Sequence, residues 1–352
     1  MPATTAASRD EAAAQARDFP RLVADIGGTN ARFGWIEAPG APVSLVRTLS
    51  VPAFAGPGEA ARSYLDDLAT QQGGAWRAPR HAAFAVATAV AGDRVAFTNS
   101  HWDFSREAVR QALGVEQLLM LNDFEALALS LPCLGAAQLR CPDGRLPRAP
   151  GHAAPGTPAP LAVVGPGTGL GVGAVVHTRQ GWVALPGEGG HATLAAGHAL
   201  EAEVIGVVRR QFAHVSAERL LSGIGLPLLH QALGEVHGQP VAAPWSAEAI
   251  VNGALAGDQA LCGDTVDLFC ALLGSFAGNV ALTLGARGGV YIGGGIVPRF
   301  ADRFFASAFR ERFEAKGRFQ AYLAAIPTAL ITDTLAALTG GALAIEQQVA
   351  LG

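Results

Sequence analysis

Short apolar runs bounded by glycine alternate along this chain with longer segments in which apolar residues recur at helical spacing. A short apolar run that ends in glycine or a polar pair is typical of a buried strand, and helical spacing is typical of a helix with one buried face. In the first half, strands are predicted over residues 22–27, 31–37, 43–51, 82–89, 93–98 and 117–121, and helices over 59–70, 106–113 and 124–131. Strands that alternate with helices favour the α/β class.

The second half of the chain is mostly helical by the same criterion. Helices are predicted over residues 200–212, 216–222, 226–233, 246–256, 258–284, 299–313 and 334–347, and strands over 290–292 and 329–332. Leu268–Ala286 is uncharged and close to the length of a membrane span, but Asn279 and Thr283 place polar groups on one face. We therefore predict a buried helix, in which Gly274 and Gly278 let a backbone or a ligand approach closely.

Two segments with the same pattern begin the two halves of the chain. Residues 22–34 and residues 161–173 each predict a strand, a Gly-Thr turn and a second strand. When they are aligned, Leu22, Gly28, Thr29 and Gly34 match Leu161, Gly167, Thr168 and Gly173. Asp25 has no counterpart, because Val164 stands at its position. We predict a duplicated unit whose two turns are similar in shape and different in chemistry.

Two other segments do not predict regular structure. Residues 1–20 carry three acidic side chains and lack the apolar centre of a secretory signal, so we expect a flexible tail. Residues 134–160 are rich in proline, glycine and arginine, which disfavours long elements, and we place an inter-domain connection there.

Composition narrows the class of protein. Half of the 352 residues are hydrophobic and 15% are charged, which excludes disorder for most of the chain. The net charge of −4 leaves no basic excess for nucleic acid. The four cysteines form no C-x-x-C pair, which argues against zinc knuckles and thioredoxin-type motifs, and their number suits a reducing cytosol.

The two Gly-Thr turns are candidate phosphate sites. Each turn presents backbone N–H groups and a hydroxyl, so a facing pair could grip a polyphosphate, although two ordinary hairpin turns would have the same sequence. The chain has no P-loop motif. Gly169–Ala174 loosely fits a dinucleotide fingerprint, but Val175–His177 predicts a strand where that motif requires a helix.

Several polar groups remain open to two interpretations. Asp123 follows a buried strand and could accept a substrate proton, or Asp123 or Asn122 could only cap the next helix. Glycines surround Glu188 and His191, which suits a small polar ligand or a tight surface loop. Ser216–Arg219 could open a helix with a simple cap, and Gly293–Gly295 could be a plain turn or a platform for an aromatic base.

An ordered set of motifs resembles the bacterial glucokinase family, the ATP-dependent hexokinase branch of the actin-like ATPases. The motifs are Asp-Ile-Gly-Gly-Thr-Asn (25–30), Leu-Asn-Asp-Phe (121–124), Gly-Thr-Gly-Leu-Gly (167–171), Pro-Gly-Glu-Gly-Gly-His (186–191) and Ser-Ala-Glu-Arg-Leu-Leu-Ser-Gly (216–223). The resemblance implies a duplicated actin-like (ribonuclease H-like) α/β fold around a cleft. It implies a small domain over residues 21–133 and 335–352 and a large domain over 161–334.

The resemblance also implies an activity, the phosphorylation of glucose at its 6-hydroxyl by ATP, with Asp123 as the base. The sugar ligands it implies are Thr98, Asn99, Asn122, Asp123, Glu188, His191 and Glu218. The ATP residues are Ala24, Asp25, Ile26, Gly27, Gly28, Thr29, Gly167, Thr168, Gly294 and Gly295. Asp25 would hold the water shell of Mg²⁺. Related ROK kinases carry zinc-bound cysteines after this histidine; residues 192–198 hold none, so we expect no zinc.

We therefore expect a cytoplasmic enzyme of glycolysis that is a homodimer and binds neither nucleic acid nor membranes. A kinase for another hexose or an amino sugar is the nearest alternative. A sugar-sensing regulator without catalysis and an actin-like ATPase with a protein client are further alternatives. The intact Asp123 disfavours the regulator, and the polar set Asn122, Glu188, His191 and Glu218 favours a polyhydroxylated ligand over a protein client.

Overall fold

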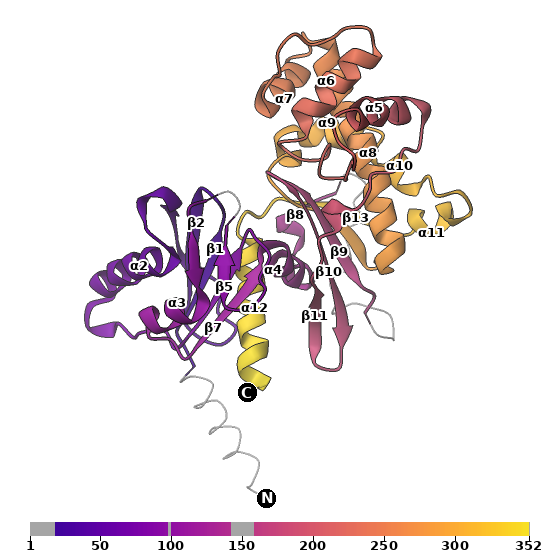
Figure 1. Cartoon of the computed structure of the whole chain (residues 1–352). Helices are drawn as coiled ribbons and strands as arrows, with labels where there is room; N and C mark the ends of the chain where they lie inside the picture. Colours follow the sequence, from indigo (N-terminus) through magenta and orange to yellow (C-terminus); the bar gives the residue numbers. More distant parts are fainter. Residues whose placement is uncertain (1–17, 98–99, 142–157, 352) are drawn as a thin grey trace, which may run out of the picture. The chain divides into compact units, whose positions relative to one another are not determined.

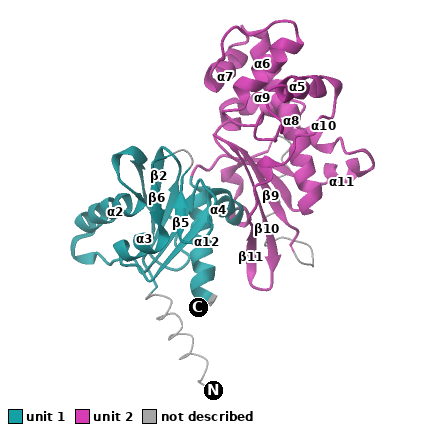
Figure 2. Cartoon of the chain, in the orientation of Figure 1, with its two compact units in different colours: residues 1–130, 335–352 teal, residues 131–334 magenta. Residues whose placement is uncertain are grey.

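The computed structural model describes residues 18–97, 100–141 and 158–351. These residues divide into two compact units, which Figure 2 colours separately. Unit 1 takes the chain up to Ser130 together with the segment from Leu335 onward, and unit 2 is Leu131–Thr334. By this division the described part of the Pro-rich segment belongs to unit 2.

Unit 1 is built on a five-stranded sheet with the order β3-β2-β1-β4-β7. Its strands are β1 (Arg21–Ile26), β2 (Asn30–Ile36), β3 (Ser44–Ser50), β4 (His81–Val86) and β7 (Gln117–Asn122). The first three strands pair antiparallel, and β1, β4 and β7 pair parallel. A separate hairpin joins β5 (Arg94–Ala96) to β6 (Asp103–Ser105).

The side chains of β1 point alternately into two apolar layers of unit 1. Leu22, Ala24 and Ile26 pack in the cluster that also holds side chains of α2 (Pro57–Gln72) and α3 (Arg106–Leu113). Val23 packs in a second cluster with side chains of α12 (Ala336–Leu351), the last helix of the chain. Side chains alternate faces along a strand, so Asp25 lies on the face of Val23. The short helix α4 (Asp123–Ser130) packs against α12.

Helix α3 begins and ends at the predicted residues because both of its ends carry local signals. The Ser105 hydroxyl accepts a hydrogen bond from the Ala108 N–H at 3.1 Å, which caps the start. Gly114 adopts a left-handed conformation at the end, with φ of 68°. The predicted range 106–113 is confirmed.

Unit 2 repeats the sheet order of unit 1. Figure 1 labels β8, β9, β10, β11 and β13 of this second sheet. Its order is β11-β10-β9-β12-β13-β8, with the first three strands antiparallel and β9, β12 and β13 parallel. The strands are β9 (Leu161–Pro166), β10 (Leu170–Thr178), β11 (Gly181–Leu185), β12 (Gly289–Ile292), β13 (Thr328–Ile331) and β8 (Leu139–Arg140). The predicted duplication is confirmed, and β8 is an addition at one edge.

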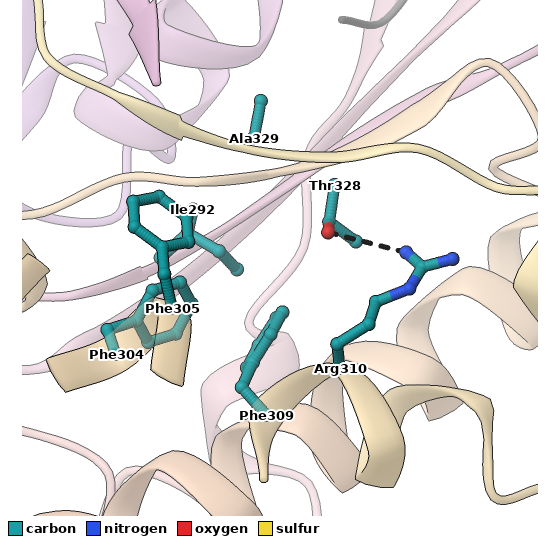
Figure 3. Close-up of a pocket in the computed structure, with 7 residues that line it drawn as sticks. All are labelled: Ile292, Phe304, Phe305, Phe309, Arg310, Thr328 and Ala329. Carbon is teal, nitrogen blue, oxygen red and sulfur yellow. Dashed lines mark hydrogen bonds between the residues drawn. The ribbon is translucent and has the colours of Figure 1, made fainter. Parts of the chain in front are cut away.

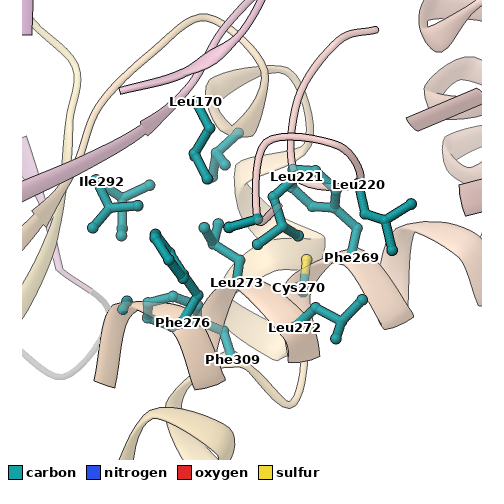
Figure 4. Packing of buried hydrophobic residues seen from close by; sticks show 14 of the residues in the cluster. Leu170, Leu220, Leu221, Phe269, Cys270, Leu272, Leu273, Phe276, Ile292 and Phe309 are labelled. Atoms are coloured by element: carbon teal, nitrogen blue, oxygen red, sulfur yellow. The ribbon is translucent and has the colours of Figure 1, made fainter. Parts of the chain in front are cut away.

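Unit 2 also contains α-helices. They are α5 (Ala199–Arg209), α6 (Leu226–Val236), α7 (Ala247–Ala256), α8 (Ala260–Leu284), α9 (Ala301–Ala306), α10 (Phe309–Glu314) and α11 (Gln320–Ala324). Of these, α8 packs against β9 and β12 of the sheet. By length and composition alone α8 could cross a membrane, yet most of it is buried within unit 2. Figure 4 shows Cys270 and Leu273 of α8 in this core beside Leu221. The predicted buried helix is confirmed.

Two glycines of α8 allow the close approach that their positions predict. A Cβ atom on Gly274 would overlap the carbonyl oxygen of Phe309, and one on Gly278 would overlap that of Phe313. Both carbonyls belong to α10, so it is a backbone, and not a ligand, that uses this space.

Two predicted helices are wrong. Residues 216–222 form turns instead of a helix: the Arg219 and Leu220 N–H groups donate only three residues back along the chain. The N–H groups of Ala217 and Glu218 donate to the carbonyls of Ala192 and Gly190 in another loop. The predicted helix over 299–313 divides into a 3₁₀ turn, α9 and α10. The break lies at Ser307, whose hydroxyl donates to Phe304 and accepts from the Phe309 N–H.

Candidate active site

In unit 1, the junction between β7 and α4 places Asn122 and Asp123 next to each other. The Phe124 N–H donates to Oδ1 of Asn122 and to Oδ1 of Asp123, both at 2.9 Å. Nδ2 of Asn122 donates to the Thr88 carbonyl at 3.2 Å, which ties the end of β7 to the loop after β4. Asn122, the residue before α4, therefore caps the helix, and Asp123, its first residue, shares the same N–H. Asp123 is half-buried, at the carboxyl end of a parallel strand, where open α/β sheets bind ligands.

The first Gly-Thr turn joins β1 to β2. The Gly27 N–H donates to the Asn30 carbonyl at 2.9 Å, and the Val51 N–H donates to the Thr29 carbonyl at 2.9 Å. Thr29 and Asn30 are exposed. The turn is therefore anchored through its own backbone and the residue that follows β3, and its threonine is accessible to a ligand.

Asp25 stands beside this turn with a fixed partner. It lies opposite Arg32 in the β1–β2 register, and Nη1 of Arg32 is 3.2 Å from Oδ2 of Asp25. Burial raises the pKa of the Asp25 carboxyl above its ordinary value, and the Arg32 charge opposes part of that increase. Thr98 and Asn99, the remaining sugar ligands predicted in this part of the chain, lie outside the described residues.

In unit 2, the second Gly-Thr turn joins β9 to β10. The Gly167 N–H donates to the Gly169 carbonyl at 2.8 Å, and Gly167 accepts through its own carbonyl from the Gly223 N–H at 2.8 Å. Gly294 packs so closely on this strand end that a Cβ atom would overlap the Pro166 carbonyl oxygen. Thr168, Gly294 and Gly295 are exposed. The structure thus brings together the ATP-binding candidates of this unit.

The three sugar-binding candidates of unit 2 gather around His191. Its Nε2 atom is 4.0 Å from Oε2 of Glu188, and its Nδ1 atom is 3.9 Å from Oε1 of Glu218. The side chains of His191 and Glu188 are exposed, whereas that of Glu218 is 24% exposed. Two carboxylates and an imidazole at this spacing offer acceptors and donors to neighbouring hydroxyl groups.

Glu218 also contacts the second Gly-Thr turn. Its Oε2 atom accepts a hydrogen bond from the Leu170 N–H at 2.9 Å. Leu170 and Gly223 belong to the motifs 167–171 and 216–223, but sequence analysis assigned no role to either residue. Both are far along the chain from their partners, and no local pattern could have paired them.

Two cavities in the described part of unit 2 are lined by none of the predicted site residues. One of about 200 Å³ lies between α9, α10 and the sheet, where Nη1 of Arg310 donates to Oγ1 of Thr328 at 3.3 Å (Figure 3). Another of about 420 Å³ contains Glu201, which pairs with the buried Arg312 at 2.9 Å. Within residues 18–97, 100–141 and 158–351, no group of three or more His, Cys, Asp or Glu side chains is arranged to hold a metal ion.

Comparison with known proteins identifies a family that matches most of this chain. The family model described as Glucokinase matches residues 22–348. Curated proteins named Glucokinase from Aromatoleum aromaticum and Chromobacterium violaceum are 49% and 50% identical over 332 residues, which is 94% of this chain and 96% and 91% of theirs. The crystal structure of a glucokinase from an Antarctic psychrotroph is 36% identical, covers 93% of this chain and 98% of its own, and superposes with a TM-score of 0.81. With the repeated sheet order, these matches establish an actin-like ATPase fold, and the chain belongs to the glucokinase family.

Proposed function

We propose that this enzyme transfers the γ-phosphoryl group of ATP to the 6-hydroxyl of glucose, giving glucose 6-phosphate and ADP, the first step of glycolysis. Membership of the glucokinase family over residues 22–348 is the observation that carries the proposal. The motifs that distinguish the family are present, including the carboxylate of Asp123 at a strand end.

Asp123 acts as the general base in this proposal. It accepts the proton of the 6-hydroxyl as that oxygen attacks the γ-phosphorus. The capping bond from the Phe124 N–H fixes one of its oxygens, and Asn122 keeps the end of the strand in place through Thr88. The proposed sugar ligands are Thr98, Asn99, Asn122, Asp123, Glu188, His191 and Glu218.

The Gly-Thr turns bind the phosphates of ATP in this proposal. Their N–H groups and hydroxyls neutralise the charge that develops on the transferred group. The proposed ATP residues are Ala24, Asp25, Ile26, Gly27, Gly28, Thr29, Gly167, Thr168, Gly294 and Gly295. Exposed Gly294 and Gly295 leave bare backbone on which an adenine could lie.

Asp25 is the residue that would hold Mg²⁺ through its water shell. A single carboxylate fits this ion, because Mg²⁺ keeps several waters and takes its other ligands from substrate phosphates. The ion would supply charge neutralisation between the β- and γ-phosphates. Arg32 keeps the carboxylate of Asp25 oriented until the ion arrives.

Coupled ADP release across a panel of hexoses and amino sugars tests the proposed function. We expect turnover with glucose to exceed turnover with each other sugar. Faster turnover with another sugar would reassign the substrate, and sugar binding without ADP release would favour a regulator. We further propose a cytoplasmic homodimer, to be checked by sedimentation. All four cysteines are free thiols, which suits a reducing compartment.

A further inference from the structure

Glu218 stands between two parts of unit 2 that the proposed function treats separately. Its Oε1 atom is 3.9 Å from Nδ1 of His191, among the proposed sugar ligands. Its Oε2 atom accepts the Leu170 N–H at 2.9 Å, where the second Gly-Thr turn enters β10. One carboxylate therefore has one oxygen for the sugar side and the other for the phosphate side.

The backbone around Glu218 holds this arrangement firmly. The Glu218 N–H donates to the Gly190 carbonyl at 2.9 Å, and the Ser222 hydroxyl donates to the Glu218 carbonyl at 2.7 Å. Gly190, the residue before His191, lies against the Leu170 carbonyl, with no room for a Cβ atom. The loop of His191, the segment of Glu218 and the turn thus form one hydrogen-bonded assembly.

Gly169 leaves the space that the carboxylate occupies. A Cβ atom on Gly169 would overlap Oε2 of Glu218, and its other near neighbour is the carboxyl carbon of the same side chain. Gly169 is outside the set of glycines with positive φ, so the backbone at this position accepts an L-residue. A larger residue at Gly169 is therefore opposed by the carboxyl group of the flexible Glu218 side chain and not by the backbone.

We propose that Glu218 couples the sugar site to the second Gly-Thr turn, and that Gly169 is a positioning residue that makes room for this carboxylate. The proposal rests on the proposed function, in which Glu218 binds sugar and the turn binds phosphate. Sugar that engages Oε1 then fixes Oε2 on the Leu170 N–H and orders the turn, so glucose and ATP should strengthen each other's binding.

Gly169→Ala tests the positioning role of Gly169 without removing any sugar ligand. We expect the added methyl group to displace the carboxylate and to raise the glucose Kd, measured by calorimetry without nucleotide, about tenfold, the range for hydrogen bonds to a charged group. Gly206→Ala is the matched control, because a Cβ atom on Gly206 of α5 meets open space. It should leave the Kd unchanged.

A double-mutant cycle separates this effect from damage to the turn. In a Glu218→Ala background the carboxylate is absent, so Gly169→Ala should change the glucose Kd less than about twofold. Equal changes in both backgrounds, or no change in the single variant, would overturn the proposal. Melting temperatures of all variants exclude unfolding as the cause.

The conservative variant at Glu218 gives a second readout. Glu218→Gln keeps an oxygen acceptor for the Leu170 N–H, so ATP affinity should survive while glucose affinity falls. Glu218→Ala should weaken both, and equal ATP affinity in the two variants would contradict the coupling. If the unaltered enzyme bound glucose without releasing ADP, the proposed phosphoryl transfer would be overturned. The coupling would still be decided by the glucose and ATP Kd values of the Glu218 variants.

Discussion

The two units share a sheet order and differ in the charges placed on it. Strands β3-β2-β1-β4-β7 of unit 1 correspond to β11-β10-β9-β12-β13 of unit 2. At equivalent positions before the Gly-Thr turn stand Asp25, paired with Arg32, and Val164, which is fully buried. The duplicated backbone supplies the turn in both units, whereas acidic chemistry on that strand exists in only one.

The two turns also differ in how they are anchored. The last paired residues are Ile26 and Ala31 in the first hairpin, and Pro166 and Leu170 in the second. The first turn is anchored through the backbone of Val51, the residue that follows β3. The second is held through the backbone of Gly223 and, in addition, by a side chain, Glu218, from a distant loop. Sugar binding should therefore change the conformation of the Gly-Thr turn more in unit 2 than in unit 1.

Asp123→Asn is the strongest test of the assignment of base chemistry to unit 1. The amide keeps the capping bond to the Phe124 N–H and removes the proton acceptor. Loss of a general base typically lowers the rate about 10²–10⁴-fold, so kcat should fall at least 100-fold. Steady-state kinetics and a melting curve check this, and near-normal turnover would refute the role of Asp123.

Val164→Asp attempts to give unit 2 the carboxylate that unit 1 has. Val164 is 0% exposed, so the new carboxyl would have no solvent and no Arg32 equivalent. An uncompensated buried charge costs about 3–5 kcal/mol of unfolding free energy. Calorimetry should show lower stability than for Val164→Thr, which has nearly the same volume. Equal stabilities would mean that the two strands tolerate charge alike.

Glu188→Ala separates sugar recognition in unit 2 from nucleotide binding. Sugar hydroxyls would lose a charged acceptor, worth about 1.5–3 kcal/mol, so the glucose KM should rise about tenfold or more. The ATP Kd measured without sugar should not change, because the Glu188 side chain pairs with His191, whereas the bond to the Gly-Thr turn comes from Glu218. Weakening of both ligands would argue against this separation.

Asp25→Asn should have a small effect on stability that depends on pH. Because burial raises the pKa of Asp25, ionising this carboxyl costs stability in the folded state. That stability is fully present below about pH 4 and is lost as pH rises through the folded-state pKa. The melting temperature of the variant relative to the unaltered protein should therefore increase from acid to neutral pH. A difference independent of pH would contradict the raised pKa.

Elements with local signals were predictable from the sequence, as α3 illustrates. Ser105 and Gly114 mark its two ends, and both act as caps in the structure. The repeated Gly-Thr segments similarly indicated the duplication of the sheet. The turns over 216–222 were not predictable, because the N–H groups of Ala217 and Glu218 tie this segment to carbonyls in another loop. Helical spacing in a sequence carries no record of such distant partners.

The candidate site also combines local contacts, which the sequence predicts, with distant contacts, which only the structure shows. The short spacing from Glu188 to His191 fixed their proximity from the sequence alone. The bond from Leu170 to Glu218 depends on the packing of two distant loops, so only the structure could reveal it. At Asp123, sequence analysis left capping and catalysis as alternatives, and the structure shows that capping is present and does not exclude the other role.

The position of α12 has a consequence for synthesis of the chain. Leu338 and Ile345 of this last helix cover Val23 and Ala83 of unit 1, although residues 131–334 separate the two segments in sequence. On the ribosome, the strands of unit 1 emerge first and must wait for the whole of unit 2 before their covering helix appears. A chain that terminates early therefore keeps an apolar face uncovered, which is a signal that chaperones and proteases can read.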